Sequence, residues 1–172
     1  MSREARRFGG DAFLEAAGRL FERSAYGNAA LDDFLDVLSQ VSGRDMQDWA
    51  RAWLHTAGPS ILTNELVVDG GRIASLTLRQ EGTDPTTGEP VLRPHTLVVG
   101  LYSLGEDGTL VRTHRLPVTM ETEQIEVPEA VGLLAPDVVL VNDEDLTYAV
   151  VRPDNDSLSC LAASLGSVRD PM

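Results

Sequence analysis

The sequence lacks lysine, contains a single cysteine, Cys160, and draws only 5% of its 172 residues from the aromatic types. One cysteine cannot form an internal disulfide, and this scarcity is typical of a reducing compartment, so we expect a cytoplasmic protein. No apolar run approaches the roughly 18 residues of a membrane span, and the basic N-terminus lacks the apolar stretch of a signal peptide. These absences argue against a disulfide-stapled secreted domain and against a membrane-embedded chain.

The charge balance is strongly acidic, with 27 acidic residues, 14 basic residues that are all arginine, and a formal net charge of −13. Such a surface repels phosphate backbones, so we expect no nucleic-acid partner. Apolar residues make up 42% and charged residues 24% of the chain, which is typical of a soluble globular protein. A chain of this length can bury roughly 70% of its unfolded surface, enough to fold without a metal or a disulfide.

The N-terminal third carries apolar residues at helical spacing and predicts three helices within residues 1–57. Asp11, Asn28 and Asp45 are suitable N-caps for the three, and Gly43 is placed to end the second. The residues expected to be buried are Phe13, Ala17, Leu20 and Phe21 in the first helix, Leu31, Phe34, Leu35, Leu38 and Val41 in the second, and Met46, Trp49, Ala50, Trp53 and Leu54 in the third.

From about Ile61 the apolar period changes from 3.6 to 2, which indicates strands. Seven short strands separated by turn-forming residues predict a β-sandwich of two sheets. The expected strands cover residues 64–68, 72–79, 95–104, 109–119, 123–127, 138–141 and 147–150.

The connections between the strands carry their own predictions. Residues 105–108 are expected to close a hairpin that places His95 opposite about Val118. Residues 81–94 contain three prolines and are expected to form a long exposed loop. Residues 142–145, Asn-Asp-Glu-Asp, form the densest acidic cluster; they lack the ligand spacing and glycine of a calcium loop, so we expect an exposed turn.

The chain becomes helical again after Pro153. Residues 154–156 can cap a helix with Leu158, Leu161 and Leu165 on one face. The predicted fold class is therefore α+β: an N-terminal helical cluster, an antiparallel β-sandwich and a short C-terminal helix. The corresponding domain boundaries are 1–57, 58–150 and 151–172.

Several short stretches occur in an order and at a spacing typical of one enzyme family. They are YGN at 26–28, LDDFL at 31–35, SGRD at 42–45, W…WL at 49–54, TAGP at 56–59, LRPH at 92–95, GLY at 100–102, LVND at 140–143, LTY at 146–148 and SL at 157–158. Together they resemble the aminopeptidase N family of zinc metallopeptidases, and the actinobacterial branch most closely.

The resemblance implies a place for each part of the chain. Residues 1–57 would be the end of the catalytic domain, 58–150 a β-sandwich domain, and 151–172 the start of a C-terminal helical domain. The chain would then be a non-catalytic structural fragment of a bacterial enzyme that removes N-terminal residues from peptides, with the remaining domains as its partners. Exposed apolar helix faces at both ends could also self-associate. The alternative is a free-standing β-sandwich module that binds a protein or a glycan.

The residues that carry the family's chemistry are absent from the sequence. The family holds zinc with H-E-x-x-H and a downstream glutamate, because histidines at i and i+4 share one helix face, and no such motif occurs here. We therefore predict no catalytic, cofactor-binding or metal-binding residue in this chain, and we assign zinc to the full-length parent alone. His55, His95 and His114 are expected to be surface or hydrogen-bonded histidines.

Other candidate residues are also interpreted as structural. The family's oxyanion-stabilising tyrosine would lie upstream, so that role is not given to Tyr26, Tyr102 or Tyr148. Cys160 has no base or orienting group nearby in the sequence, which favours a structural cysteine. Trp49 and Trp53 could form a stacking platform, but their i, i+4 spacing on an apolar helix face favours the core.

Overall fold

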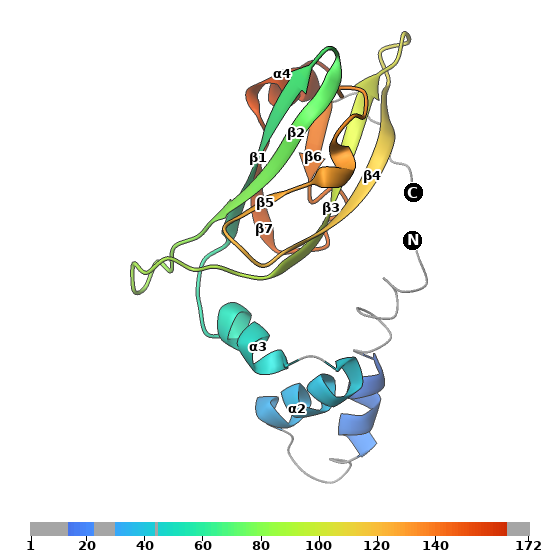
Figure 1. The fold of residues 1–172 in the computed structure, drawn as a ribbon. Coiled ribbons are helices and arrows are strands. Elements are labelled where there is room, and N and C mark those ends of the chain that lie inside the picture. The colour runs from blue at the N-terminus through green and yellow to red at the C-terminus, as the bar shows by residue number, and fades with distance from the viewer. Residues whose placement is uncertain (1–13, 23–29, 44, 165–172) are drawn as a thin grey trace. The chain divides into compact units, whose positions relative to one another are not determined.

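The structure, a computed structural model, describes residues 14–22, 30–43 and 45–164. It divides into two compact units, Met1–His55 and Thr56–Met172. The first unit is helical, and the second is a β-sandwich that carries one helix (Figure 1). This confirms the predicted α+β fold with its N-terminal helical cluster, its sandwich and its C-terminal helix.

The helical unit contains a helix at residues 14–22, α2 at Leu31–Ser42 and α3 at Met46–Leu54. Its buried surface is narrower than the predicted stripes, because helices of this length in a small cluster pack along only a few positions. Phe13 lies outside the described residues. Ala16, Leu35, Val37 and Ala50 are buried, whereas Phe21, Leu31, Trp49 and Leu54 are exposed, so the burial expected for these last four is wrong.

The ends of the helices show which cap predictions succeed. Asp45 caps α3 as predicted, since its Oδ1 accepts the N–H of Gln47 at 2.8 Å. Gly43 ends α2 in the left-handed conformation, with φ of 69°. The N-cap of α2 is Ala30 and not Asn28. Asp33 Oδ2 accepts the N–H of Ala30 at 2.9 Å, and the helix begins at the next residue. Asn28 and Asp11 themselves lie outside the described residues.

The sandwich contains all seven predicted strands, arranged in two sheets. The strands are β1 (Ser60–Asp69), β2 (Arg72–Glu81), β3 (His95–Leu104), β4 (Leu110–Met120), β5 (Gln124–Glu126), β6 (Val138–Val141) and β7 (Ala149–Arg152), with a 3-10 turn η1 at Pro128–Ala130. One sheet has the order β5-β2-β1-β7 and the other β4-β3-β6. Neighbouring strands are antiparallel except for the parallel pair β1–β7.

The core lies between the two sheets and follows from the period-2 pattern. Alternate residues of each strand face inward, as Leu62 of β1, Leu78 of β2 and Leu101 of β3 do. The outward positions of β1 and β2 are largely polar and solvent-exposed, which is the alternation expected of a sheet with one wet face.

The β3–β4 hairpin forms as predicted, but its register differs by two residues. His95 lies opposite Met120, and Val118 lies opposite Leu97. Two features each contribute one residue to this shift. Leu104 pairs with Leu110, so the loop covers residues 105–109, and a β-bulge, where Leu101 pairs with His114 while Tyr102 pairs with Arg112, adds one residue to β4.

The C-terminal helix α4 spans Asn155–Ser164 and packs on the sandwich beside β6. Asp154 caps it, since its Oδ1 accepts the N–H of Ser157 at 2.8 Å. The face expected from the sequence is partly wrong, because Leu158 is exposed while Ser157 is buried. Leu165 lies outside the described residues. None of the described helices is long and apolar enough to span a membrane.

Candidate functional site

Two side chains form hydrogen bonds to the backbone at the start of the sandwich unit. The N–H of Ala57 donates to Asp84 Oδ2 at 2.8 Å, and the Ala57 carbonyl accepts from Arg93 Nη2 at 3.1 Å. The same Arg93 nitrogen donates to Thr56 Oγ1 at 2.6 Å. Asp84 and Arg93, which we call the junction clamp, therefore satisfy both polar groups of Ala57 and fix the path of the chain into β1.

Residues 81–94 form the predicted loop and most of them are exposed, but the two residues of the junction clamp are not. Asp84 is only 7% exposed and Arg93 only 2%. The loop folds back on itself, because Asp84 Oδ1 accepts the N–H groups of Thr86 and Thr87, and the Asp84 N–H donates to the Glu89 carbonyl. These backbone donors, that of Ala57 foremost, hold the pKa of Asp84 below its ordinary value.

A buried glutamine supports the clamp from the sheet side. Gln80 of β2 donates from Nε2 to the carbonyls of Arg93 at 2.9 Å and Thr122 at 3.0 Å. Its Oε1 accepts the N–H of Arg93 at 3.2 Å. Since Gln80 is itself buried, these bonds tie Arg93 to the rigid part of the sandwich and not to a mobile surface group.

The position after Ala57, the residue bound by the clamp, requires glycine. Gly58 has φ of +78°, and a Cβ built on it would lie 3.1 Å from the Thr83 carbonyl oxygen and 3.2 Å from Pro85 Cδ. Both the left-handed backbone and the close approach exclude an ordinary side chain. The T-A-G-P stretch is therefore fitted closely to the loop of residues 82–94.

A second polar cluster joins β3, β4 and the turn after β6. Tyr102 donates its hydroxyl to Asp143 Oδ1 at 2.5 Å, and Arg112 Nη1 donates to Asp143 Oδ2 at 2.6 Å. Arg115 binds Glu144 through two bonds, at 2.6 and 2.7 Å. We call these five residues the Asp143 cluster.

The Asp143 cluster corrects part of the expectation of an exposed acidic turn at residues 142–145. The Asp143 side chain is only 3% exposed and is paired with Arg112. Burial, together with the hydrogen bond and charge of Asp143, raises the pKa of Tyr102 to about 12. The hydrogen bond from Arg115 holds the pKa of Glu144 below its ordinary value. Asp143 and Glu144 therefore connect strands, whereas Asp145 is exposed, as predicted.

Asn142 forms the turn that positions Asp143 in the cluster. Its backbone is left-handed, with φ of 59°, a conformation that asparagine tolerates better than most residues. Its Oδ1 accepts the N–H groups of Leu146 and Thr147, and its Nδ2 donates to the Thr147 carbonyl at 2.9 Å.

The three histidines occupy separate positions. His55 is the exposed C-cap residue of α3, and His114 lies on β4 beside Thr113. His95 is fully buried, and its Nδ1 lies 2.7 Å from Thr147 Oγ1. In residues 14–22, 30–43 and 45–164, no three His, Cys, Asp or Glu side chains are grouped to hold a metal. These donors do not fit the zinc that the resemblance implies for the parent.

Burial, and secondly the positive charge of Arg93, lowers the pKa of His95 from 6.5 to about 4. As the pH falls below 6.5, His95 is therefore protonated in the unfolded chain but stays neutral in the native state. The free energy of unfolding falls as the pH drops from 6.5 to 4. We expect the wild-type chain to lose about 2 kcal/mol more than His95→Gln between pH 7 and pH 5. Urea unfolding of both proteins at the two pH values measures this. A difference below about 0.5 kcal/mol would contradict it.

A third cluster attaches α4 to both sheets. Asp154 Oδ2 accepts from Asn64 Nδ2 of β1 at 2.7 Å and from Ser157 Oγ at 2.8 Å. Ser157 Oγ in turn accepts the N–H of Val139 of β6 at 2.9 Å. The free thiol of Cys160 is half-buried, where the sequence predicted a structural cysteine.

These clusters bring together stretches that the sequence analysis could only place in order. T-A-G-P meets L-R-P-H through Arg93, G-L-Y meets L-V-N-D through Tyr102 and Asp143, and L-R-P-H meets L-T-Y through His95 and Thr147. Sequence reasoning missed all three contacts. The one available signal was the presence of charged residues inside these apolar, turn-rich stretches.

No protein-family model matches the chain. The chain is 40% identical over 168 residues to the aminopeptidase N of Streptomyces lividans, a match that covers 95% of this chain and 20% of that protein. The chain corresponds to a segment of an aminopeptidase N-type protein. The aminopeptidase N of Lactococcus lactis subsp. cremoris is 24% identical to this segment over 165 residues, which is 94% of the chain and 18% of that protein.

The solved structures agree on the fold. The segment superimposes on the crystal structure of Legionella pneumophila aminopeptidase A in complex with aspartic acid with a TM-score of 0.62, at 17% identity, over 93% of this chain and 18% of that one. The chain thus spans about a fifth of the length of the relatives that it matches. The alternative of a free-standing binding module gains no support from these matches.

Proposed function

We propose that this segment is the structural connector of a longer, zinc-dependent aminopeptidase that removes N-terminal residues from peptides. The sandwich would hold the catalytic domain and the C-terminal helical domain in a fixed relation, and it would contribute no catalytic residue of its own. Zinc would be bound by parts of the longer protein outside residues 1–172. The proposal rests on the length relation to the aminopeptidase relatives and on how the two ends of the sandwich are held.

The junction clamp is the observation that carries this proposal. The segment divides into its two units between His55 and Thr56, and Ala57, two residues later, has both backbone polar groups bound by buried side chains. A flexible tether would need no such bonds, because solvent can satisfy an exposed linker. We propose residues 1–57 as the end of the catalytic domain and 58–150 as the sandwich domain, a boundary two residues beyond the division between the compact units.

The other end of the sandwich is held in the same manner. Asp154 caps α4 and also binds Asn64, so the first turn of the helix is attached to β1. We assign residues 151–172 to the start of the C-terminal helical domain. The remaining domains would then be the partners of this segment. Cytoplasmic location is part of the proposal and is supported by the single cysteine.

Self-association is a further proposed interaction of the isolated segment. Leu31, Trp49 and Leu54 are exposed on the helical unit, and Leu158 is exposed on α4. Apolar side chains in such positions favour contact with a second copy when their natural neighbours are missing.

The experiment that tests the connector role uses Arg93→Met in the longer protein. Without the guanidinium, Thr56 and the Ala57 carbonyl lose their donor, so the junction opens more often. We expect thermolysin to cut between α3 and β1 about tenfold faster, with reduced peptidase turnover and unchanged zinc stoichiometry. The matched control is Arg79→Met, which removes a half-exposed arginine of β2 and should change cleavage less than about twofold.

Three outcomes would contradict the proposal. Unchanged junction cleavage and turnover in Arg93→Met would mean that the clamp does not connect the two domains. Loss of zinc in Arg93→Met would mean that this segment supports the metal site. Stoichiometric zinc in the 172-residue chain, or turnover of aminoacyl-arylamides above blank by that chain, would make it catalytic in its own right.

A further inference from the structure

Three apolar side chains lie exposed within five residues at one end of the sandwich. Leu146, Tyr148 and Val150 are 50%, 74% and 45% exposed, and we call them the β7 patch. Val150 is the second residue of β7, and Tyr148 directly precedes that strand. Within the described part of the chain, β7 is the outermost strand of its sheet.

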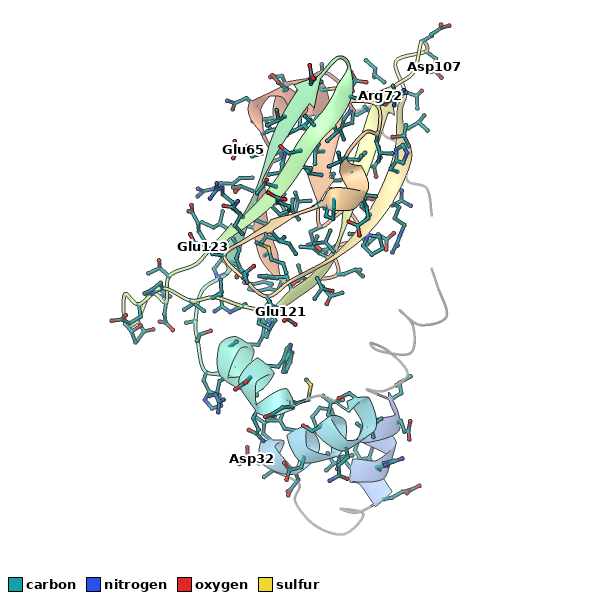
Figure 2. All side chains as sticks on the ribbon, in the orientation of Figure 1. Asp32, Glu65, Arg72, Asp107, Glu121 and Glu123 are labelled. Carbon is teal, nitrogen blue, oxygen red and sulfur yellow. The ribbon has the colours of Figure 1, made fainter. Side chains whose placement is uncertain are left out.

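The β7 patch lies where the chain enters the sandwich. Val150 is aligned with Ile61 and Ala149 with Ser60 on β1, and these are the first residues of the sandwich after the junction clamp. Further along the same outer face the residues are charged or polar, as in the row formed by Glu65, Thr77 and Glu126. Glu65 projects away from the sandwich (Figure 2). The middle of this outer face is therefore polar, and it separates the β7 patch from Val67, which is exposed at the far end of β1.

We propose that the β7 patch is the docking surface for the catalytic region of the same, longer polypeptide. This inference rests on the proposed function and adds the surface through which the two regions meet. The partner is expected to present apolar side chains, since the exposed groups of the patch are those of leucine, tyrosine and valine. Four-fifths of the longer relatives lie outside the matched segment, which provides the chain that can cover it.

The size of the patch favours a tethered partner over a second copy. A stable dimer usually buries about 800 Å² on each partner, whereas three partly exposed side chains offer a few hundred Å² at most. The net charge of −13 adds a repulsion that so small a patch does not overcome, whereas the self-association proposed above uses the helix faces. A region linked through a short junction has an effective concentration in the millimolar range, at which a small contact is sufficient.

An exposed edge strand with apolar side chains is also a hazard in a free-standing protein, because such edges pair with other chains. Natural sheets protect their edges with charges, prolines or a covering segment. Val150 is an exposed side chain of β7, and the exposed Tyr148 directly precedes the strand. A covering segment supplied by the longer protein satisfies this requirement.

Nitration with tetranitromethane, followed by peptide mass mapping, tests the proposal. Tyr148 should react readily in the monomeric 172-residue chain and at least about tenfold more slowly in the longer protein, because the docked region excludes the reagent. Tyr102, which is buried and bound to Asp143, is the internal control and should react slowly in both.

A variant pair provides the second measurement. In the longer protein, Tyr148→Asp should raise the rate of thermal inactivation about tenfold, because a carboxylate cannot dock against an apolar surface. The matched control, Val131→Asp, changes an exposed apolar residue outside the patch and should leave that rate unchanged. In the 172-residue chain the two variants should have equal stability.

Each result either supports or overturns the inference. Equal nitration of Tyr148 in both proteins, or equal inactivation by the two variants, would overturn it. Protection of Tyr148 in the 172-residue chain that grows with concentration would identify a second copy as the occupant and would also overturn it. If Tyr148 is unprotected while Arg93→Met still opens the junction, the docking surface fails and the connector role stands. If Tyr148 is protected while Arg93→Met has no effect, the docking surface stands and the connector role fails.

Discussion

Replacing Asp143 with alanine is expected to lower the free energy of unfolding by about 3 kcal/mol. The substitution leaves Arg112 with only its longer contact to Glu144 Oε1 at 3.5 Å and the Tyr102 hydroxyl without its acceptor, at a site where the Asp143 side chain is 3% exposed. Removing one member of a buried ion pair is costly because the remaining charge stays desolvated. Urea unfolding at neutral pH, followed by circular dichroism, measures the loss.

The control for this prediction is Glu123→Ala, which removes an exposed carboxylate near the sandwich edge (Figure 2). That change should alter stability by less than about 0.5 kcal/mol. A loss of less than about 1 kcal/mol for Asp143→Ala would show that the cluster is no more than a surface ion pair. The pKa of Tyr102 gives a second readout, since it should fall from about 12 when the neighbouring carboxylate is removed.

Replacing Gly100 with alanine is expected to cost about 3 kcal/mol, the upper end of the range for overpacking. A Cβ at this position would lie 2.7 Å from Asp143 Cγ, from Asp143 Oδ2 and from Tyr102 Cε2. None of these groups can retreat easily, because each is fixed by the hydrogen bonds of the Asp143 cluster. Chemical denaturation measures the loss.

Gly18→Ala is the control for this second prediction, because a Cβ at Gly18 of the first helix meets no atom within 4 Å. That substitution should be neutral or stabilising, since alanine favours a helix by roughly 1 kcal/mol over glycine. The double variant Gly100→Ala/Asp143→Ala should lose less than the sum of the single losses, since two of the three close contacts are to Asp143. Strict additivity would mean that the clash lies elsewhere.

The sequence predicts well where neighbouring residues decide the structure. The strands β3 and β6 were placed with their observed bounds, because short apolar runs bounded by turn-forming residues indicate buried strands. Asp45 was recognised as a cap because its bond reaches a backbone N–H only two residues away. The resemblance to the aminopeptidase N family came from similarly short stretches, and the 40% identical relative supports it.

The predictions that failed concern residues whose environment is built by distant parts of the chain. The loop of residues 81–94 has the prolines and glycines of an exposed connection, yet Arg93 is buried because Thr56 and Ala57 lie beside it. Trp49 was expected in the core from its spacing, but a helical period states only that a face is apolar and not that a neighbour covers it. It is exposed in this segment.

The sequence by itself determined the order and type of the elements, the acidic and lysine-free composition, and the absence of the H-E-x-x-H motif. Only the tertiary structure decided which polar residues meet: Ala57 and Asp84 are 27 positions apart, Thr56 and Arg93 are 37, and Tyr102 and Asp143 are 41. The reason is physical. Local patterns are set by a helical turn or a pleat, whereas these contacts depend on strand order and register, including a one-residue bulge in β4.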